Sequence, residues 1–229
     1  RIMKETRYKK DLAEFDVEKI YSCDEVLDFL ADQPKRKFTE SVDVAIKLGI
    51  DAKKSDQNVR GSLTLPHSLG KKIKVAVFVD EDKAGEAKEA GADFIGTDAL
   101  IEKYKDGNID FDVAVTTPSM MKVVSKLAKV LGPKGLMPNP KSGTVTDNIE
   151  QAIKDVKHGQ VRFKTEQAGV VQGTIANSSM EKEKVRENLD SFITELKRLK
   201  PPSSKGIYIK AIYLSTTMGP GYRIDVSQF

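Results

Sequence analysis

Few side chains in this 229-residue sequence could carry metal or nucleophilic chemistry. The chain has one cysteine, Cys23, and two histidines, His67 and His158, which stand far apart in the sequence. A single cysteine allows no internal disulfide, no Cys-rich zinc site and no Cys-x-x-Cys redox pair. Two separated histidines offer little for a His-rich metal site or a Ser-His-Asp triad. Enzymes without histidine exist, but these residue types offer little for catalysis, and we predict no catalytic residues and no metal.

Two glycine-containing stretches resemble phosphate-binding loops only in part. Gly70-Lys71 lacks both the glycine five positions earlier and the following Ser or Thr of a P-loop. The stretch 219–221, Gly-Pro-Gly, begins like a dinucleotide-binding motif, but Ile224 stands where the third glycine belongs and no helix is predicted to follow. We expect no nucleotide or other cofactor.

Basic residues gather in patches on a nearly neutral chain. Lys and Arg number 38 against 34 Asp and Glu. Residues 113–146 contain five lysines and no acid, and further patches stand at residues 35–37 and 53–54. Local basic patches indicate docking on a phosphate backbone, although ordinary solvated lysines would give the same charge pattern.

The two ends of the chain share the pattern of an α+β fold. Ser22 and Glu25 form a capping box that starts a helix over residues 24–33, which Pro34 ends. Alternating apolar residues predict strands at 42–50 and 59–65, paired as a hairpin across a basic loop. A second hairpin is predicted from 160–166 and 170–175, then a helix over 180–199 and a strand over 207–214.

The middle of the chain alternates strands with helices. Strands are predicted at 73–79, 93–95 and 112–115, and helices at 82–90, 98–105, 118–130 and 148–158. Thr117 is expected to cap the third helix, with Pro118 at its first position. This alternation is typical of a parallel sheet. A loop at 132–144, with three prolines and three glycines, is either a rigid recognition surface or a structural connector.

These patterns predict a mixed α/β protein with one domain inserted into another. Residues 1–67 and 159–229 would form a discontinuous α+β domain, an antiparallel sheet with helices. Residues 68–158 would form an inserted three-layer α/β/α domain. Two stretches of chain would then cross between the domains, which is a natural hinge.

Several stretches of this sequence resemble the large-subunit ribosomal protein L1 family, in its bacterial form. They lie in order at residues 47–51, 55–61, 65–67, 90–93, 111–112, 131–141, 143–145 and 215–219. The resemblance covers most of the chain. It implies that the inserted domain is Rossmann-like and that the split domain carries the main RNA-binding surface.

The resemblance also implies partners and a location. Similar proteins bind large-subunit rRNA at the mobile stalk beside the tRNA exit site and assist release of deacylated tRNA. Bacterial relatives also repress translation of their own operon mRNA through a mimic of the rRNA site. We expect the chain to be cytoplasmic and ribosome-associated, with an organelle matrix left open. We expect a monomer off the ribosome, no signal peptide and no membrane partner.

RNA contacts are predicted from the resemblance together with the chemistry of the residues. Folded RNA is recognised through shape, ribose hydroxyls and phosphates, which favours short hydroxyl side chains and a glycine that allows close approach. Phe38 could stack on a base or pack in the core. The predicted RNA-binding residues are Lys37, Phe38, Glu40, Ser41, Arg60, Lys164, Ser215, Thr216, Thr217, Met218 and Gly219. Lys134 and Lys141 are predicted as secondary contacts.

Two departures from the family pattern weaken peripheral contacts. Residues 175–179 are Ile-Ala-Asn-Ser-Ser where relatives commonly have Ile-Gly-Lys, so one phosphate-binding lysine is missing. Glu5 interrupts the basic N-terminus. Two alternative functions stay open: a nucleotide-dependent enzyme built on the inserted domain, and a translational repressor that acts away from the ribosome.

Overall fold

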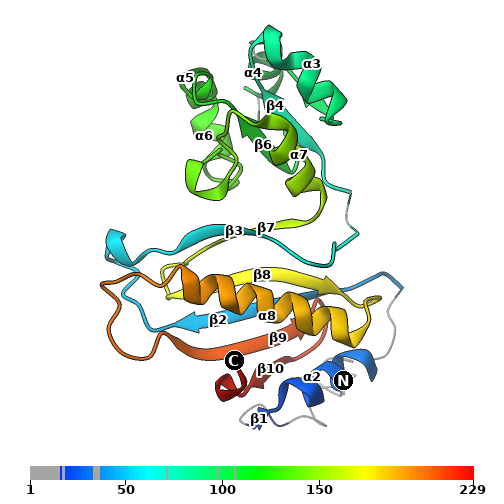
Figure 1. Ribbon diagram of the computed structural model, residues 1–229, viewed down its shortest axis with the longest axis vertical. Helices are drawn as coiled ribbons and strands as arrows, with labels where there is room; N and C mark the ends of the chain where they lie inside the picture. Colours follow the sequence, from blue (N-terminus) through cyan, green and yellow to red (C-terminus); the bar gives the residue numbers. More distant parts are fainter. Residues whose placement is uncertain (1–15, 17–18, 33–36, 71, 97, 106) are drawn as a thin grey trace, which may run out of the picture. The chain divides into compact units, whose positions relative to one another are not determined.

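The chain folds into two compact units (Figure 1). The structure is a computed structural model that describes residues 16, 19–32, 37–70, 72–96, 98–105 and 107–229. One unit comprises residues 1–69 and 161–229, and the other residues 70–160. The predicted mixed α/β class is confirmed, because both units combine helices with sheets.

A five-stranded sheet forms the centre of the first unit, in the order β1-β10-β9-β2-β8. Its strands are β1 (Ile20–Tyr21), β2 (Ser41–Leu48), β8 (Val170–Asn177), β9 (Ile209–Thr216) and β10 (Gly221–Ile224). The ladders β10-β9, β9-β2 and β2-β8 are antiparallel, and β1 pairs parallel to β10. The sequence patterns had indicated neither β1 nor β10, which are both short.

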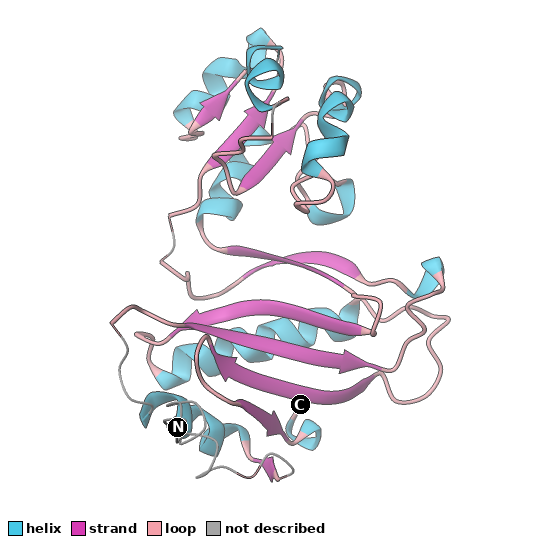
Figure 2. Ribbon diagram, turned by 180° about the vertical axis from the view of Figure 1, so that it is seen from behind, coloured by secondary structure: helices cyan, strands magenta, loops and turns pink. Residues whose placement is uncertain are grey.

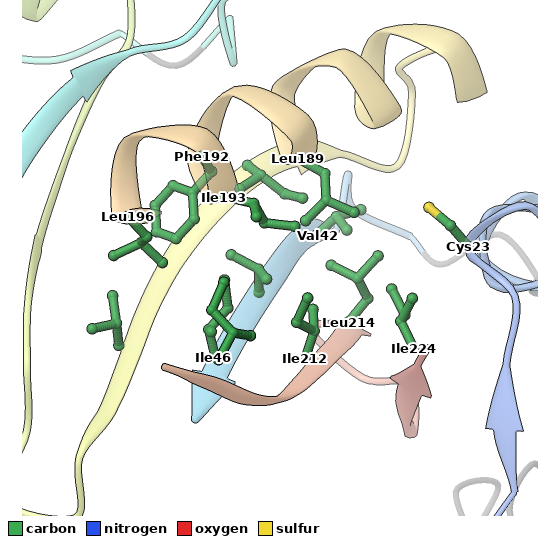
Figure 3. Close-up of a cluster of buried hydrophobic side chains, with 14 of the residues drawn as sticks. Cys23, Val42, Ile46, Leu189, Phe192, Ile193, Leu196, Ile212, Leu214 and Ile224 are labelled. Atoms are coloured by element: carbon green, nitrogen blue, oxygen red, sulfur yellow. The ribbon is translucent and has the colours of Figure 1, made fainter. Parts of the chain in front are cut away.

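The side chains of β2 alternate between buried and less buried. One face of the sheet is therefore covered, and the other face is more exposed. The amphipathic helix α8 (Lys182–Arg198) sends Leu189, Phe192, Ile193 and Leu196 onto the apolar residues of the strands (Figure 3). The opposite face of the sheet is not covered by α8, as the view from behind shows (Figure 2). Side chains that point away from α8 are therefore not covered by this helix, and we call this side of the sheet its open face.

Helix α2 (Cys23–Asp32) begins at the predicted capping box. The Glu25 amide donates to Ser22 Oγ at 3.2 Å, and the Ser22 amide donates to the Glu25 carboxylate at 2.9 Å. These reciprocal bonds satisfy two amides that a helix start would otherwise leave unpaired. Gln33 and Pro34, where the sequence pattern predicts the helix end, lie outside the described residues.

The first predicted hairpin is wrong, and the second forms only next to its turn, where Thr165 pairs with Val171. β3 (Arg60–Thr64) pairs with β7 (Gln160–Lys164) in a separate two-stranded sheet, and β2 pairs with β8 and β9. The turn between β7 and β8 does close, since Gly169 N–H donates to Glu166 O at 2.9 Å, but the two strands then enter different sheets. Alternation identifies the buried face of a strand but carries no information about its partner.

The second unit contains a parallel sheet in the order β5-β4-β6. Its strands are β4 (Val75–Phe78), β5 (Phe94–Ile95) and β6 (Val113–Thr116). Alternate residues of β4 and β6 enter two separate apolar clusters: α3 (Glu81–Glu89) and α7 (Ile149–Lys157) contribute to one, and α4 (Asp98–Tyr104) contributes to the other. Parallel strands buried on both faces have continuous apolar sequences, as these do.

The helix predicted over 118–130 is broken into three short segments, α5 (Met121–Val124), η2 (Ser125–Leu127) and α6 (Ala128–Leu131). Ser125 Oγ donates to Met121 O at 2.7 Å, a side-chain bond that competes with the helical ladder. Thr117 does not cap the segment, because its hydroxyl pairs with Ser119 Oγ at 3.0 Å and Met120 occupies the cap position.

Candidate nucleic-acid interface

Two segments far apart in the sequence meet at the first residue of β2. The Ser41 amide donates to Thr217 Oγ1 at 3.0 Å, and the Thr217 amide donates to Ser41 O at 3.1 Å. The Met218 amide donates to Glu40 Oε1 at 3.0 Å. We call residues 40–41 and 216–219 the turn platform. The structure thus brings together two groups of predicted RNA-binding residues from opposite ends of the chain.

Glu40 and Thr216 lie inside the turn platform. Both residues are only 4% exposed. The Glu40 backbone is held on both sides by Ser178, whose Oγ accepts from the Glu40 amide at 3.0 Å and whose amide donates to Glu40 O at 2.8 Å. Glu40 therefore positions the turn through Met218, and direct contact of its carboxylate with RNA stays a prediction.

Other residues of the site are exposed. Phe38 is 53% exposed and Met218 54% exposed, which is unusual for large apolar side chains, and Lys37 and Thr217 are exposed beside them in sequence. The core alternative for Phe38 is therefore wrong. A cation and an aromatic ring just before β2, with a hydroxyl and a thioether at the preformed turn, offer charge, stacking and hydrogen bonding to a nucleic acid.

Residues 177–179, at the end of β8, have a structural role that the sequence patterns did not reveal. Asn177 Nδ2 donates to Leu69 O at 2.9 Å, and Asn177 Oδ1 accepts from the Ser179 amide at 3.0 Å. Together with the bonds from Ser178 to Glu40, these contacts tie the end of β8 to the turn platform. The sequence Asn-Ser-Ser at the end of a strand could have indicated this role, because Asn and Ser side chains often close turns by hydrogen bonds to the backbone.

Arg60 and Lys164 lie together but away from the turn platform. Both line a pocket of about 670 Å³ that also includes Ala52 and residues 165–168. Thr165 pairs with Val171, which is opposite Ile46 in β2, whereas Thr216 is opposite Val42. Ser41 and Ile46 are five residues apart along β2, a separation of about 17 Å in an extended strand. These two basic residues are thus at the opposite end of β2 from the turn platform.

Ser215 belongs to the open face of the sheet. It lines a shallow depression of about 520 Å³ together with Asp43 and Thr174, whose hydroxyl donates to Asp43 Oδ1 at 2.6 Å. Gly219 N–H donates to Thr216 O at 3.2 Å and so closes the turn. The predicted residues 215–219 therefore divide between the sheet face and the turn itself.

Lys134 belongs to the second unit, where it is exposed and its Nζ donates to Gly107 O at 3.0 Å. The loop that carries it is tied down through Thr144, which is 1% exposed and accepts from the Asn139 amide at 2.8 Å. These bonds hold the loop in place, which is compatible with both a rigid recognition surface and a structural connector. The Lys141 side chain and the predicted basic residues Lys35 and Arg36 lie outside what the structure describes.

The remaining chemistry-bearing residues take part in structural contacts. Cys23 is buried, and burial raises the pKa of its thiol to about 11. His67 Nε2 lies 2.6 Å from Glu187 Oε2. In the described part of the chain, no three His, Cys, Asp or Glu residues are grouped as metal ligands, and no helix there is long and apolar enough to cross a membrane.

The geometry describes a mixed α/β protein whose candidate site is an exposed polar turn beside an open sheet. Comparison with protein families matches residues 30–220 to the ribosomal protein L1p/L10e family. The chain belongs to this family, so the resemblance seen in the sequence is confirmed.

Three relatives carry the name large ribosomal subunit protein uL1. The protein of Buchnera aphidicola is 48% identical over 98% of this chain and 97% of its own length. The Alcanivorax borkumensis protein is 50% identical over 90% of both chains. The Saccharophagus degradans protein is 50% identical over 93% of this chain and 92% of its own.

Proposed function

We propose that this chain is a structural, non-catalytic protein of the large ribosomal subunit and that it binds large-subunit rRNA through the turn platform. The relatives' name supports the assignment to the large subunit. The observation that carries RNA binding is the contact between residues 40–41 and 217–218, which holds an exposed turn in one conformation before any ligand arrives.

Preorganisation favours this function on physical grounds. An ordered turn loses less conformational entropy on binding than a disordered one does, so more of the contact energy remains as affinity. Exposed Phe38 and Met218 can stack on or pack against unstacked bases, and the Thr217 hydroxyl, which accepts from the Ser41 amide, holds the turn that presents Met218. The open sheet face with Ser215 extends this polar surface.

We further propose that the first unit is the rRNA-binding domain and that the second is a Rossmann-like inserted domain. In this proposal the protein sits at the mobile stalk, contacts exit-site tRNA and assists its release. Off the ribosome it is a monomer that binds its own operon mRNA and represses translation. It resides in the cytoplasm, associated with ribosomes.

Two substitutions test the turn platform. Thr217→Val removes the hydroxyl at nearly constant volume, and Met218→Asp places a negative charge where RNA would approach. Binding of the full chain to an rRNA stalk fragment, measured by filter binding, should weaken by about 1–3 kcal/mol for each. Circular dichroism should show an intact fold.

Thr194→Val on the exposed side of α8 is a matched control and should bind like the wild type. Undiminished binding by both platform variants would remove Thr217 and Met218 from the site. The same variants should lose affinity for the operon mRNA in parallel, because that mimic would occupy the same turn. Unequal losses would show that the two RNAs use different surfaces.

A further inference from the structure

The turn platform contains the methionine that is most open to solvent among those the structure describes. Met218 is 54% exposed, whereas Met120, Met121, Met137 and Met180 are buried or half-buried. Met137 and Met180 pack against the apolar clusters of the two units. Because methionine oxidation follows exposure, a dissolved oxidant should reach Met218 before these four residues.

The bonds that hold the turn are made by the main chain around Met218. Its amide donates to Glu40 Oε1 at 3.0 Å. The neighbouring amide of Thr217 donates to Ser41 O at 3.1 Å. A chemical change at the thioether leaves these backbone bonds in place. Such a change should therefore alter the surface that the turn presents without altering the fold.

The single cysteine of the chain is a poor alternative target. Cys23 is only 1% exposed, and burial raises the pKa of its thiol to about 11. The thiolate, not the thiol, is the form that oxidants attack, and a thiol with a raised pKa forms little thiolate at neutral pH. Sensitivity to peroxide at neutral pH should therefore come from methionine.

We propose that Met218 is a site of reversible oxidation by hydrogen peroxide and that the sulfoxide form of the protein binds rRNA more weakly. The proposal rests on RNA binding by the turn platform and adds a way of regulating it. In the forward step a sulfur lone pair attacks one peroxide oxygen, the O–O bond breaks and an S–O bond forms. The leaving hydroxide takes the proton of the transferred oxygen and becomes water. The sulfur is oxidised and the peroxide is reduced.

The exposure of Met218 also suits the reverse step. Methionine sulfoxide reductases reduce the sulfoxide to the thioether with two thiols as reductant. The S–O bond breaks, the oxygen leaves as water, and the two thiols are oxidised to a disulfide. A sulfoxide on an exposed turn is accessible to such an enzyme, whereas a sulfoxide in an apolar core requires local unfolding first.

The sulfoxide should weaken RNA binding through hydration and hydrogen bonding. Oxidation converts a flexible apolar side chain into a polar one. The thioether can pack against an unstacked base, but a sulfoxide oxygen must give up bound water to do the same, which costs free energy. The sulfoxide oxygen only accepts hydrogen bonds. Phosphate oxygens are acceptors too, so the modified side chain finds no partner on the RNA backbone.

Unfolding measurements separate this effect from oxidative damage. Oxidation of Met180, which packs against the core of the first unit, would place a polar group among apolar side chains and lower stability. Oxidation of Met218 adds a polar group where solvent already reaches. The protein oxidised at Met218 should therefore unfold at the same urea concentration as the untreated protein.

The experiment oxidises the full chain with hydrogen peroxide in the presence of a metal chelator and stops the reaction with catalase. Peptide mass spectrometry identifies which methionine has gained oxygen, and filter binding measures affinity for the rRNA stalk fragment. Met218 should be oxidised first, and affinity should fall about tenfold, the size of one lost contact. Incubation with methionine sulfoxide reductases of both stereospecificities and a dithiol should restore the affinity.

Two variants assign the effect to one residue. Met218→Leu is compared with itself before and after treatment, and peroxide should leave its affinity unchanged. Met180→Leu is the matched control: it keeps Met218 and should lose affinity on treatment as the wild type does. A loss in treated Met218→Leu as large as in the wild type would overturn the proposal. Undiminished binding by wild type fully oxidised at Met218 would also overturn it.

Protection by RNA tests whether Met218 lies in the contact. Bound rRNA fragment should slow the oxidation of Met218 and leave the rate at Met121, in the second unit, unchanged. Equal oxidation rates of Met218 with and without saturating RNA would count against the proposal. If untreated wild type bound no rRNA fragment, the proposed function would fail. The order of oxidation among the methionines would still test the modification site, because that measurement needs no RNA.

Discussion

The carboxylate of Glu40 accepts a hydrogen bond at 3.0 Å from the amide of Met218, 178 residues further along the chain. Glu40 is only 4% exposed, so its carboxylate depends on protein donors in place of water. Its partner is the backbone of a residue whose own side chain is exposed at the turn. A buried acid thus holds in place the surface that we propose to contact RNA.

Replacing Glu40 should separate positioning from direct contact. Glu40→Ala leaves the Met218 amide without this acceptor, and we expect the free energy of unfolding to fall by about 1–3 kcal/mol. Glu40→Gln retains a carbonyl oxygen, so it should lose less. If Glu40 acts through the turn, affinity for the rRNA fragment should follow the same order. RNA binding that falls equally in both variants, with Glu40→Gln fully stable, would instead indicate direct contact by the carboxylate.

Asn188 should be among the most sensitive positions for stability. It is fully buried on α8, and its side chain accepts from the His67 amide at 3.0 Å and donates to His67 O at 3.1 Å and Ile175 O at 2.8 Å. Asn188→Leu would keep a side chain of similar branching but remove the hydrogen-bond partner of three backbone groups. We expect a loss of about 2–4 kcal/mol in urea unfolding.

Glu187→Gln is the control for this prediction. It removes the negative charge beside His67, and because this pair is partly exposed to solvent the charge should contribute less than about 1 kcal/mol. Equal stability of the two variants would contradict a structural role for the Asn188 side chain. The difference between them isolates the buried hydrogen bonds from the surface pair.

Stability should decline at alkaline pH because of Tyr208. Burial raises its pKa from 10.0 to about 12. Between these values the unfolded chain loses the phenol proton while the folded chain keeps it, so stability is fully present below pH 10 and falls as pH rises towards 12. Burial also raises the pKa of the Cys23 thiol, from 9.0 to about 11, so its contribution to stability is likewise lost as pH rises between these values. Urea unfolding at pH 8 to 11.5 measures the combined decline.

Tyr208→Phe should reduce this decline without a loss of stability at neutral pH. The Tyr208 hydroxyl is buried, and the described residues offer it no hydrogen-bond partner. Removing it relieves an unsatisfied group, so we expect a gain of up to about 1 kcal/mol at pH 7. Tyr213→Phe, at an exposed ring, should keep the wild-type pH dependence. A wild-type alkaline profile in Tyr208→Phe would show that this phenol is not the titrating group.

Local features of this protein could be predicted from sequence because neighbouring residues determine them. The capping box at Ser22 and Glu25 forms as predicted, and β2 buries the alternating residues that the pattern selected. Family membership was likewise evident from short ordered motifs. The capping box depends on contacts within a few residues, and the buried side of β2 depends on which face of the strand is apolar.

Tertiary structure alone decided which segments are partners. It separated β2 from β3, buried Glu40 under Met218, and placed Arg60 and Lys164 at the opposite end of β2 from Thr217. Alternation and propensity would be the same for several strand pairings. The pairing that forms depends on burial and hydrogen bonding between residues far apart in the chain, and a local pattern of polar and apolar residues does not encode those contacts.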